Sequence, residues 1–172
     1  MVVMKAIVVL VMHGVPPNDF PESDMAEFFG LQSRLKRSVG EGRVTLERRC
    51  LELDDKMRKW PRTAQNDPFY IGSQELAAQV SNATGCEVIV GFNEFCAPSL
   101  SDALNQAIAR EADKVIVITP MMTRGGEHSE VDIPAAVETA QAQHPKTAII
   151  YVWPFKVSDV ASFLAAQIVN RI

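Results

Sequence analysis

The chain has 172 residues, of which 47% are hydrophobic, and it carries a formal net charge of −4 at pH 7. This length and apolar content predict one domain that buries its own core without cross-links. The acidic balance argues against a nucleic-acid partner, because phosphate binding needs a basic face. The three cysteines form no CxxC pair. This pattern leaves room for one disulfide and favours a reducing compartment such as the cytoplasm.

The first predicted element is a buried strand at residues 2–12, within the opening stretch MVVMKAIVVLVMHG. Its apolar run is short, little positive charge precedes it, and no small-x-small cleavage site follows. We therefore interpret it as a strand and not as a signal peptide. No other stretch approaches the length of a membrane span, so we expect no membrane partner.

The segment before the second predicted strand is far longer than a single crossover helix requires. Residues 23–36 have a helical pattern of apolar side chains. Residues 37–72 are rich in arginine and lysine, and we interpret them as an inserted arm, partly helical, with turns at Pro61 and Pro68. A substrate-binding lid and a solvated surface excursion are both compatible with this composition.

Beyond the arm, strands and helices alternate. Strands are predicted at 87–92, 114–119 and 147–153, and helices at 74–83, 101–111, 132–143 and 157–172. Ser99 or Ser101, with Asp102, marks one helix start, and Asp132 before Pro134 marks another. This alternation predicts a single α/β domain, residues 1–172, with a parallel sheet of at least four strands between helices.

Three residues suited to chemistry follow successive predicted strands. His13 follows the first, Glu94 the second and His128 the third. Ligands of open parallel sheets bind at this edge, so we expect the three side chains to converge. Taken singly, each has an ordinary interpretation as a solvated histidine or as a charge at a helix start. Together, two imidazoles and a carboxylate suit Co²⁺, Fe²⁺, Ni²⁺ or Zn²⁺.

Three stretches, VMHG, GFNEFCAPSLSDAL and TPMMTRGGEHSEVDIPAAV, resemble the small class II chelatases, the CbiX-type sirohydrochlorin cobaltochelatases and ferrochelatases. The resemblance covers the first strand and roughly residues 73–172. It implies the chelatase fold, a three-layer sandwich with a parallel sheet of about four strands. It also implies ATP-independent insertion of a divalent metal into a tetrapyrrole such as sirohydrochlorin, as in cobalamin and siroheme biosynthesis.

The resemblance assigns His13, Glu94 and His128 as metal ligands and catalytic groups that also accept the protons released by the macrocycle. Glu127 stands where relatives often have a small residue, which makes it a candidate additional ligand. The metal, Co²⁺ or Fe²⁺ with Ni²⁺ as a third candidate, is a substrate, and no organic cofactor is implied. The partners implied are the tetrapyrrole and a second copy of the chain in a homodimer.

Residues just before His128 are predicted to bind the tetrapyrrole. Arg124 is a candidate partner for a peripheral carboxylate of the macrocycle, because a guanidinium matches that group with two hydrogen bonds. Gly125 and Gly126 let the backbone approach a flat, wide ligand. Two alternative functions use the same histidines and glutamate. One is a metal-dependent hydrolase with an activated water, and the other is a metal or tetrapyrrole carrier without turnover.

Overall fold

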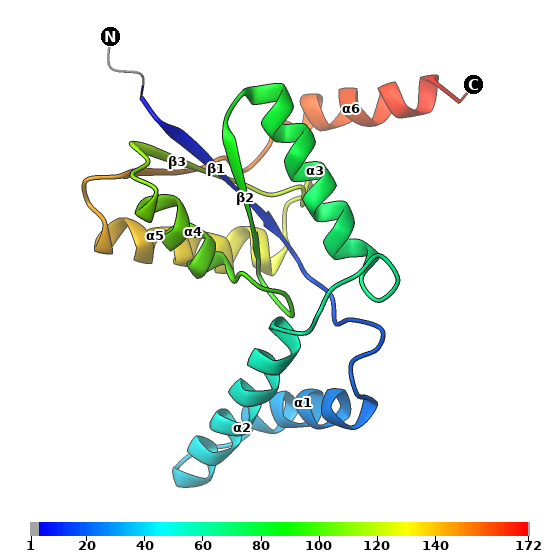
Figure 1. Cartoon of the computed structure of the whole chain (residues 1–172), viewed down its shortest axis with the longest axis vertical. Helices are drawn as coiled ribbons and strands as arrows, with labels where there is room; N and C mark the ends of the chain where they lie inside the picture. The colour runs from blue at the N-terminus through cyan, green and yellow to red at the C-terminus, as the bar shows by residue number, and fades with distance from the viewer. Residues whose placement is uncertain (1–3, 172) are drawn as a thin grey trace.

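The computed structural model describes residues 4–171, apart from the side chain of Glu41, and contains the predicted parallel sheet. Its strands are β1 (Ala6–Met12), β2 (Glu87–Phe92), β3 (Lys114–Ile118) and β4 (Ala148–Tyr151), in the order β2-β1-β3-β4 (Figure 1). All neighbouring strands are parallel. Residues 2, 3 and 172, which the sequence placed in the first strand and last helix, lie outside the described residues.

Alternation of side chains along the central strand divides the core between the two faces of the sheet. Ile7, Val9 and Val11 point to the face covered by α4 (Leu100–Ala109) and α5 (Ile133–Gln143). Leu10 and Met12 point to the opposite face, where α3 (Pro68–Thr84) packs. The central strand β1 is continuously apolar because helices cover both of its faces, and the predicted three-layer α/β sandwich is confirmed.

Two helices extend from the sheet as a hairpin, which we call the α1–α2 arm. It consists of α1 (Glu22–Leu35) and α2 (Glu41–Arg58), which lie side by side below the sheet in Figure 1. The arm has its own small core, with side chains from both helices and from the loop after β2: Phe28, Leu31, Leu53, Met57 and Phe95. Two ion pairs, Arg49–Glu27 and Lys56–Asp24, join the helices at their surface.

Residues 37–72, the predicted insert, therefore contain all of α2 and the beginning of α3. The predicted turn at Pro68 is wrong, because Pro68 is the first residue of α3. Proline suits that position, since the first helical residues have no intrahelical acceptor for their N–H groups. The N-cap is Asp67, whose carboxylate accepts a hydrogen bond from the Tyr70 N–H.

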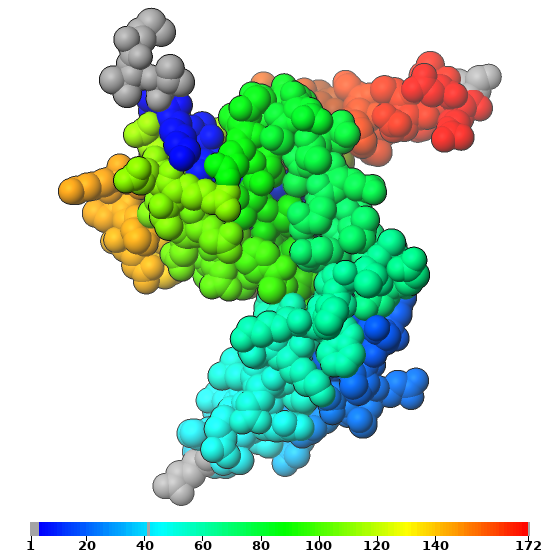
Figure 2. All heavy atoms as spheres, viewed as in Figure 1, coloured from blue at the N-terminus to red at the C-terminus, as the bar shows by residue number. Residues whose placement is uncertain are grey.

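The last helix, α6 (Val157–Val169), extends away from the sheet. Figure 2 shows it as an arm beside the body of the molecule, at the end opposite to the α1–α2 arm. None of its residues is buried. Within residues 4–171, no helix combines the length and the hydropathy needed to cross a membrane.

Candidate metal centre

His13, Glu94 and His128 meet at the carboxyl edge of the sheet. One ligand atom of each side chain lies within 4.8 Å of the ligand atoms of the other two. Oε2 of Glu94 lies 3.8 Å from Nε2 of His13 and 3.9 Å from Nε2 of His128. The strand order 2-1-3-4 reverses between β1 and β3, the strands that precede the two histidines. The cluster therefore lies where open parallel sheets place their ligands.

The loops after β1 and β2 are held together by backbone hydrogen bonds. The Asn93 N–H donates to the carbonyl of Met12, and the Glu94 N–H donates to the carbonyl of His13, both at 2.9 Å. Gly14 makes this close approach possible. Its φ is +92°, and a Cβ at this position would lie 1.9 Å from the carbonyl oxygen of Glu94. Only glycine fits here without moving the loop that carries the glutamate.

Hydrogen bonds fix which ring nitrogen of each histidine faces the centre. Nδ1 of His13 lies 2.7 Å from the carbonyl oxygen of Gly14, so it carries the proton and donates. Nδ1 of His128 lies 2.6 Å from a carboxylate oxygen of Asp132 and donates to it. Both Nε2 atoms are therefore left with a free lone pair near the Glu94 carboxylate, which is the tautomer that a metal ligand requires.

The pairing of His128 with Asp132 depends on an unusual local backbone. Residues His128–Asp132 form a single π-helical turn, η1, in which the Ile133 N–H donates to the His128 carbonyl. Such turns are rare and often lie at functional sites. The predicted helix start at Asp132 is confirmed, because α5 begins at the next residue, but the Asp132 carboxylate accepts no capping hydrogen bond and pairs with His128 instead. The His-x-x-x-Asp spacing was the sequence signal that could have indicated this pair, since it places both side chains on one helical face.

The neighbouring strand holds this turn in place. The hydroxyl of Tyr151 in β4 donates to the carbonyl of Ser129, and the Ser129 hydroxyl donates to the carbonyl of Gly126. Burial, with a smaller effect of the nearby Glu130 carboxylate, raises the pKa of Tyr151 to about 12. The phenol therefore remains a hydrogen-bond donor at neutral pH, and the position of His128 is tied to the sheet.

Two arginines at the base of the α1–α2 arm hold the loop that carries Glu94, and sequence reasoning missed both. Arg58 donates to the carbonyls of Asn93 and Cys96. Arg62 donates to the carbonyls of Val15 and Phe95, and it pairs with the Asp67 carboxylate. Their sequence neighbourhood has the composition of a solvated charged surface, whereas the Arg62–Asp67 pair is buried. Only the three-dimensional structure identifies their acceptors.

The Arg124 side chain, which was predicted to bind the tetrapyrrole, contacts a carboxylate of its own loop region in this structure. Nε of Arg124 lies 3.2 Å from a carboxylate oxygen of Glu130. A backbone hydrogen bond from Gly125, followed by the contact with Arg124, lowers the pKa of Glu130. Gly125 has a φ of +89°, and a Cβ added to it would meet no atom within 4 Å, so its backbone conformation alone requires glycine. Among the described residues, the three-member cluster does not include Glu127, which is exposed.

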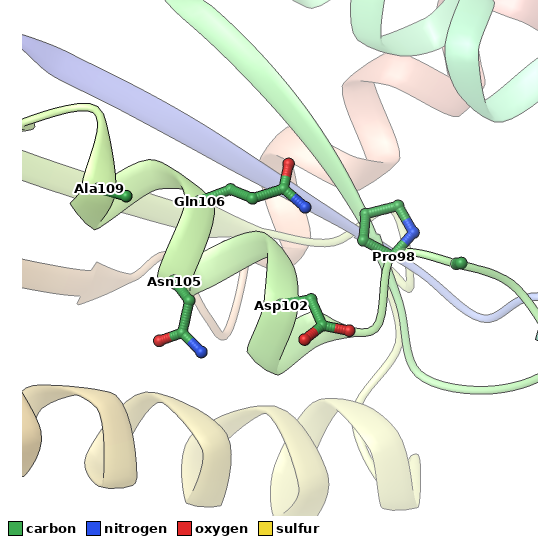
Figure 3. Close-up of a pocket in the computed structure, with 6 residues that line it drawn as sticks. Pro98, Asp102, Asn105, Gln106 and Ala109 are labelled. Carbon is green, nitrogen blue, oxygen red and sulfur yellow. The ribbon is translucent and has the colours of Figure 1, made fainter. Parts of the chain in front are cut away.

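Two hollows of the surface differ in their relation to the cluster. One of about 620 Å³ lies along α4, where the side chains of Asp102, Asn105 and Gln106 line it (Figure 3). It contains none of the three clustered residues. The other, of about 250 Å³, is formed between the α1–α2 arm and the loop after β2, and its lining includes Glu94. The smaller hollow is therefore the one that adjoins the site.

The separations within the cluster fit a loosely held divalent cation. Tetrahedral ligands at about 2.1 Å from a metal lie roughly 3.4 Å apart. The two distances from the glutamate oxygen to the imidazole nitrogens exceed this by less than 1 Å, and no two of the three ligand atoms lie more than 4.8 Å apart. Small side-chain rotations would therefore complete the contacts. Three protein ligands leave at least one coordination position open, as in sites whose metal reacts or exchanges.

Comparison with known proteins identifies the family. The family model described as CbiX matches residues 72–171. The chain is 34% identical over 70 residues to a sirohydrochlorin cobaltochelatase of Priestia megaterium, and 46% identical over 44 residues to one of Saccharolobus solfataricus. The first segment is 41% of this chain and 22% of that relative, and the second is 26% of this chain and 34% of that relative. The matched part of the chain thus spans well under half the length of either relative.

A solved structure has the same fold. The crystal structure of a CbiX protein of Marinobacter aquaeolei VT8, described as a cobalamin biosynthesis protein, aligns with a TM-score of 0.51 and 16% sequence identity. The alignment covers 96% of this chain and 95% of that one. At this identity the likeness concerns the fold alone. The family model, which matches more than half of the chain and includes the loops of Glu94 and His128, shows that this protein belongs to the CbiX family of class II chelatases.

Proposed function

We propose that this protein inserts Co²⁺ into a tetrapyrrole of the sirohydrochlorin type without using ATP. The observation that carries the proposal is the convergence of His13, Glu94 and His128 at the reversal of strand order. The names of the relatives, sirohydrochlorin cobaltochelatases, support cobalt and this macrocycle. Fe²⁺ and Ni²⁺ suit the same nitrogen and oxygen ligands and are the alternative metals. A cytoplasmic place in cobalamin-type or siroheme-type synthesis accords with this chemistry.

The proposed mechanism transfers the metal and the protons in opposite directions at one place. The macrocycle must lose two pyrrole N–H protons as its nitrogens take the metal. His13 and His128 bind the cation through Nε2, and each Nε2 becomes free to accept one proton when the metal leaves it. The carboxylate of Glu94 lowers the energy of the incoming dication, and it then stabilises the two imidazolium groups that form.

We propose that the tetrapyrrole lies over the three residues and between the loop of Arg124 and the α1–α2 arm. The Arg124 side chain is exposed and is held by a single carboxylate, so it can turn to a peripheral carboxylate of the substrate. Gly125 and Gly126 present no side chain that would keep a flat ligand away from the backbone. The hollow beside Glu94 has apolar walls from Phe28 of α1 and from Phe95 of the loop after β2.

The test is anaerobic insertion with sirohydrochlorin and Co²⁺, Fe²⁺ or Ni²⁺, in which the absorbance of the metallated product is followed. We expect His13→Ala and His128→Ala each to lower the rate at limiting metal at least tenfold, since each removes a ligand and a base together. His144→Ala is the matched control, because His144 lies at the far end of α5. Wild-type rates in both variants would refute the assignment. Binding of metal and macrocycle without faster insertion would identify a carrier.

A further inference from the structure

The side chains of α6 are mostly apolar, although the helix is exposed to solvent. The helix carries one charged side chain, Asp159, and apolar side chains on all sides. Phe163 is 51% exposed, Leu164 50% and Ile168 61%, and every residue from 161 to 171 is exposed. A helix that is apolar all round is normally buried, and a contiguous apolar surface of this kind marks a site of association.

The sheet has a matching uncovered region. On the face opposite α4 and α5, α3 packs over β1 and β2. The side chains on the same face of β3 and β4 are apolar, and we call them the open half-face: Ile116, Ile118, Ile150 and Val152. Ile150 is 44% exposed and Val152 38%. A helix about 10 Å wide covers two strands that lie about 4.8 Å apart, so this region lacks one helix.

The chain does not use its own α6 to cover the open half-face. Residues 152–156 connect β4 to α6, and they include Pro154, whose ring fixes one backbone dihedral of the short connection. From this connection α6 leads away from the sheet (Figures 1 and 2). Within residues 4–171, each chain therefore has one apolar helix without a surface to cover and one sheet surface without a helix.

We propose that two copies of this chain exchange α6, so that each helix packs on the open half-face of the other copy. A second copy is the occupant that both surfaces favour, because a two-fold axis makes the same contact twice and covers both helices and both sheets. An unrelated partner would have to supply a helix for the sheet and a groove for α6 at once. Exchange of a terminal element across a short connection is a common route to a dimer.

The test is the mass of the full chain by sedimentation equilibrium at micromolar concentration, with two single substitutions. We expect the wild-type protein to be a dimer. Ile150→Lys changes the open half-face and Leu164→Glu changes α6, and both positions are exposed within one chain, so each subunit should keep its fold. Each substitution places an unpaired charge in both contacts, and we expect the dimer dissociation constant to rise at least tenfold. Glu138→Lys, on the exposed side of α5, is the control and should remain dimeric.

Mixing the two variants tests the exchange itself. A mixed dimer has one unchanged contact and one contact in which the new lysine faces the new glutamate, so we expect dimers to return. A monomeric wild-type protein would overturn the proposal. So would a failure to recover on mixing. If Ile150→Lys stays dimeric while Leu164→Glu does not, the helices pair with each other and the proposal is wrong. The readout is mass, so these outcomes do not depend on metal insertion.

A cross-link supplies a second measurement if a charged variant fails to fold. Chains with Ile150→Cys are mixed with longer, tagged chains that carry Leu164→Cys, and the mixture is mildly oxidised. We expect a disulfide between chains of different length, absent when either introduced cysteine is omitted. A chain that carries both substitutions and forms only an internal disulfide would place α6 on its own sheet and overturn the exchange.

Discussion

Removal of the Asp132 carboxylate should weaken metal binding although this group does not reach the metal position. Its oxygen lies 2.6 Å from Nδ1 of His128, and the side chain is 46% exposed. Loss of a carboxylate that orients a ligating histidine typically lowers metal affinity 10-fold to 100-fold, which is about 1.4–2.7 kcal/mol. Because water competes for this half-exposed pair, we expect Asp132→Ala to fall near the lower limit, about 10-fold.

Asp132→Asn should have a smaller effect. The amide oxygen still accepts the hydrogen bond and keeps the ring orientation, but the charge is lost, and charge-assisted hydrogen bonds are roughly twice as strong as neutral ones. We therefore expect a loss of about threefold. The assay is anaerobic titration calorimetry with Co²⁺ at pH 7.5, together with the dependence of the insertion rate on metal concentration.

The matched control for this experiment is Glu138→Ala, which removes an exposed carboxylate from α5 without touching the centre. We expect its cobalt affinity to equal that of the wild-type protein. The reasoning is refuted if Asp132→Ala binds Co²⁺ within twofold of wild type while its circular dichroism is unchanged. In that case the hydrogen bond would not determine which nitrogen of His128 faces the metal.

Three further predictions concern the loops around the centre. Gly14→Ala should lower the free energy of unfolding, measured by urea denaturation, by at least about 2 kcal/mol. The backbone of Gly14 is left-handed, and the new methyl group would meet the carbonyl oxygen of Glu94. A loss below about 1 kcal/mol would contradict this. Arg62→Met should cost about 3–5 kcal/mol, since it leaves the buried Asp67 carboxylate unpaired, and a thermal denaturation midpoint equal to that of wild type would contradict it. Burial raises the pKa of the Cys96 thiol, so less thiolate is present at pH 8. Iodoacetamide should therefore label Cys86 in the folded protein and reach Cys96 only after unfolding, and equal rates at the two cysteines would contradict the burial.

The sequence by itself determined the strands, most of the helices and the edge of the sheet at which the candidate ligands lie. The apolar runs at β1 and β2 were identifiable because strands covered on both faces need few polar residues. The cap at Ser99 was identifiable because a serine side chain bonds an N–H within its own helix turn, here that of Asp102. These signals are local, since each depends on residues a few positions apart. The alternation of elements then predicted where the loops of the candidate ligands meet.

The tertiary structure alone decided the partners of side chains that reach between distant segments. Arg62 bonds the carbonyl of Phe95, 33 positions away, and nothing in the neighbourhood of either residue indicates the other. Asp132 has the spacing of a histidine partner, but its role depends on a π-helical turn that no propensity predicts. The direction of α6 likewise does not follow from the apolar pattern of its residues. The periodicity of apolar residues predicts which side of a helix or strand is buried. Hydrogen-bond partners and the placement of helices depend instead on which surfaces meet after the chain has folded.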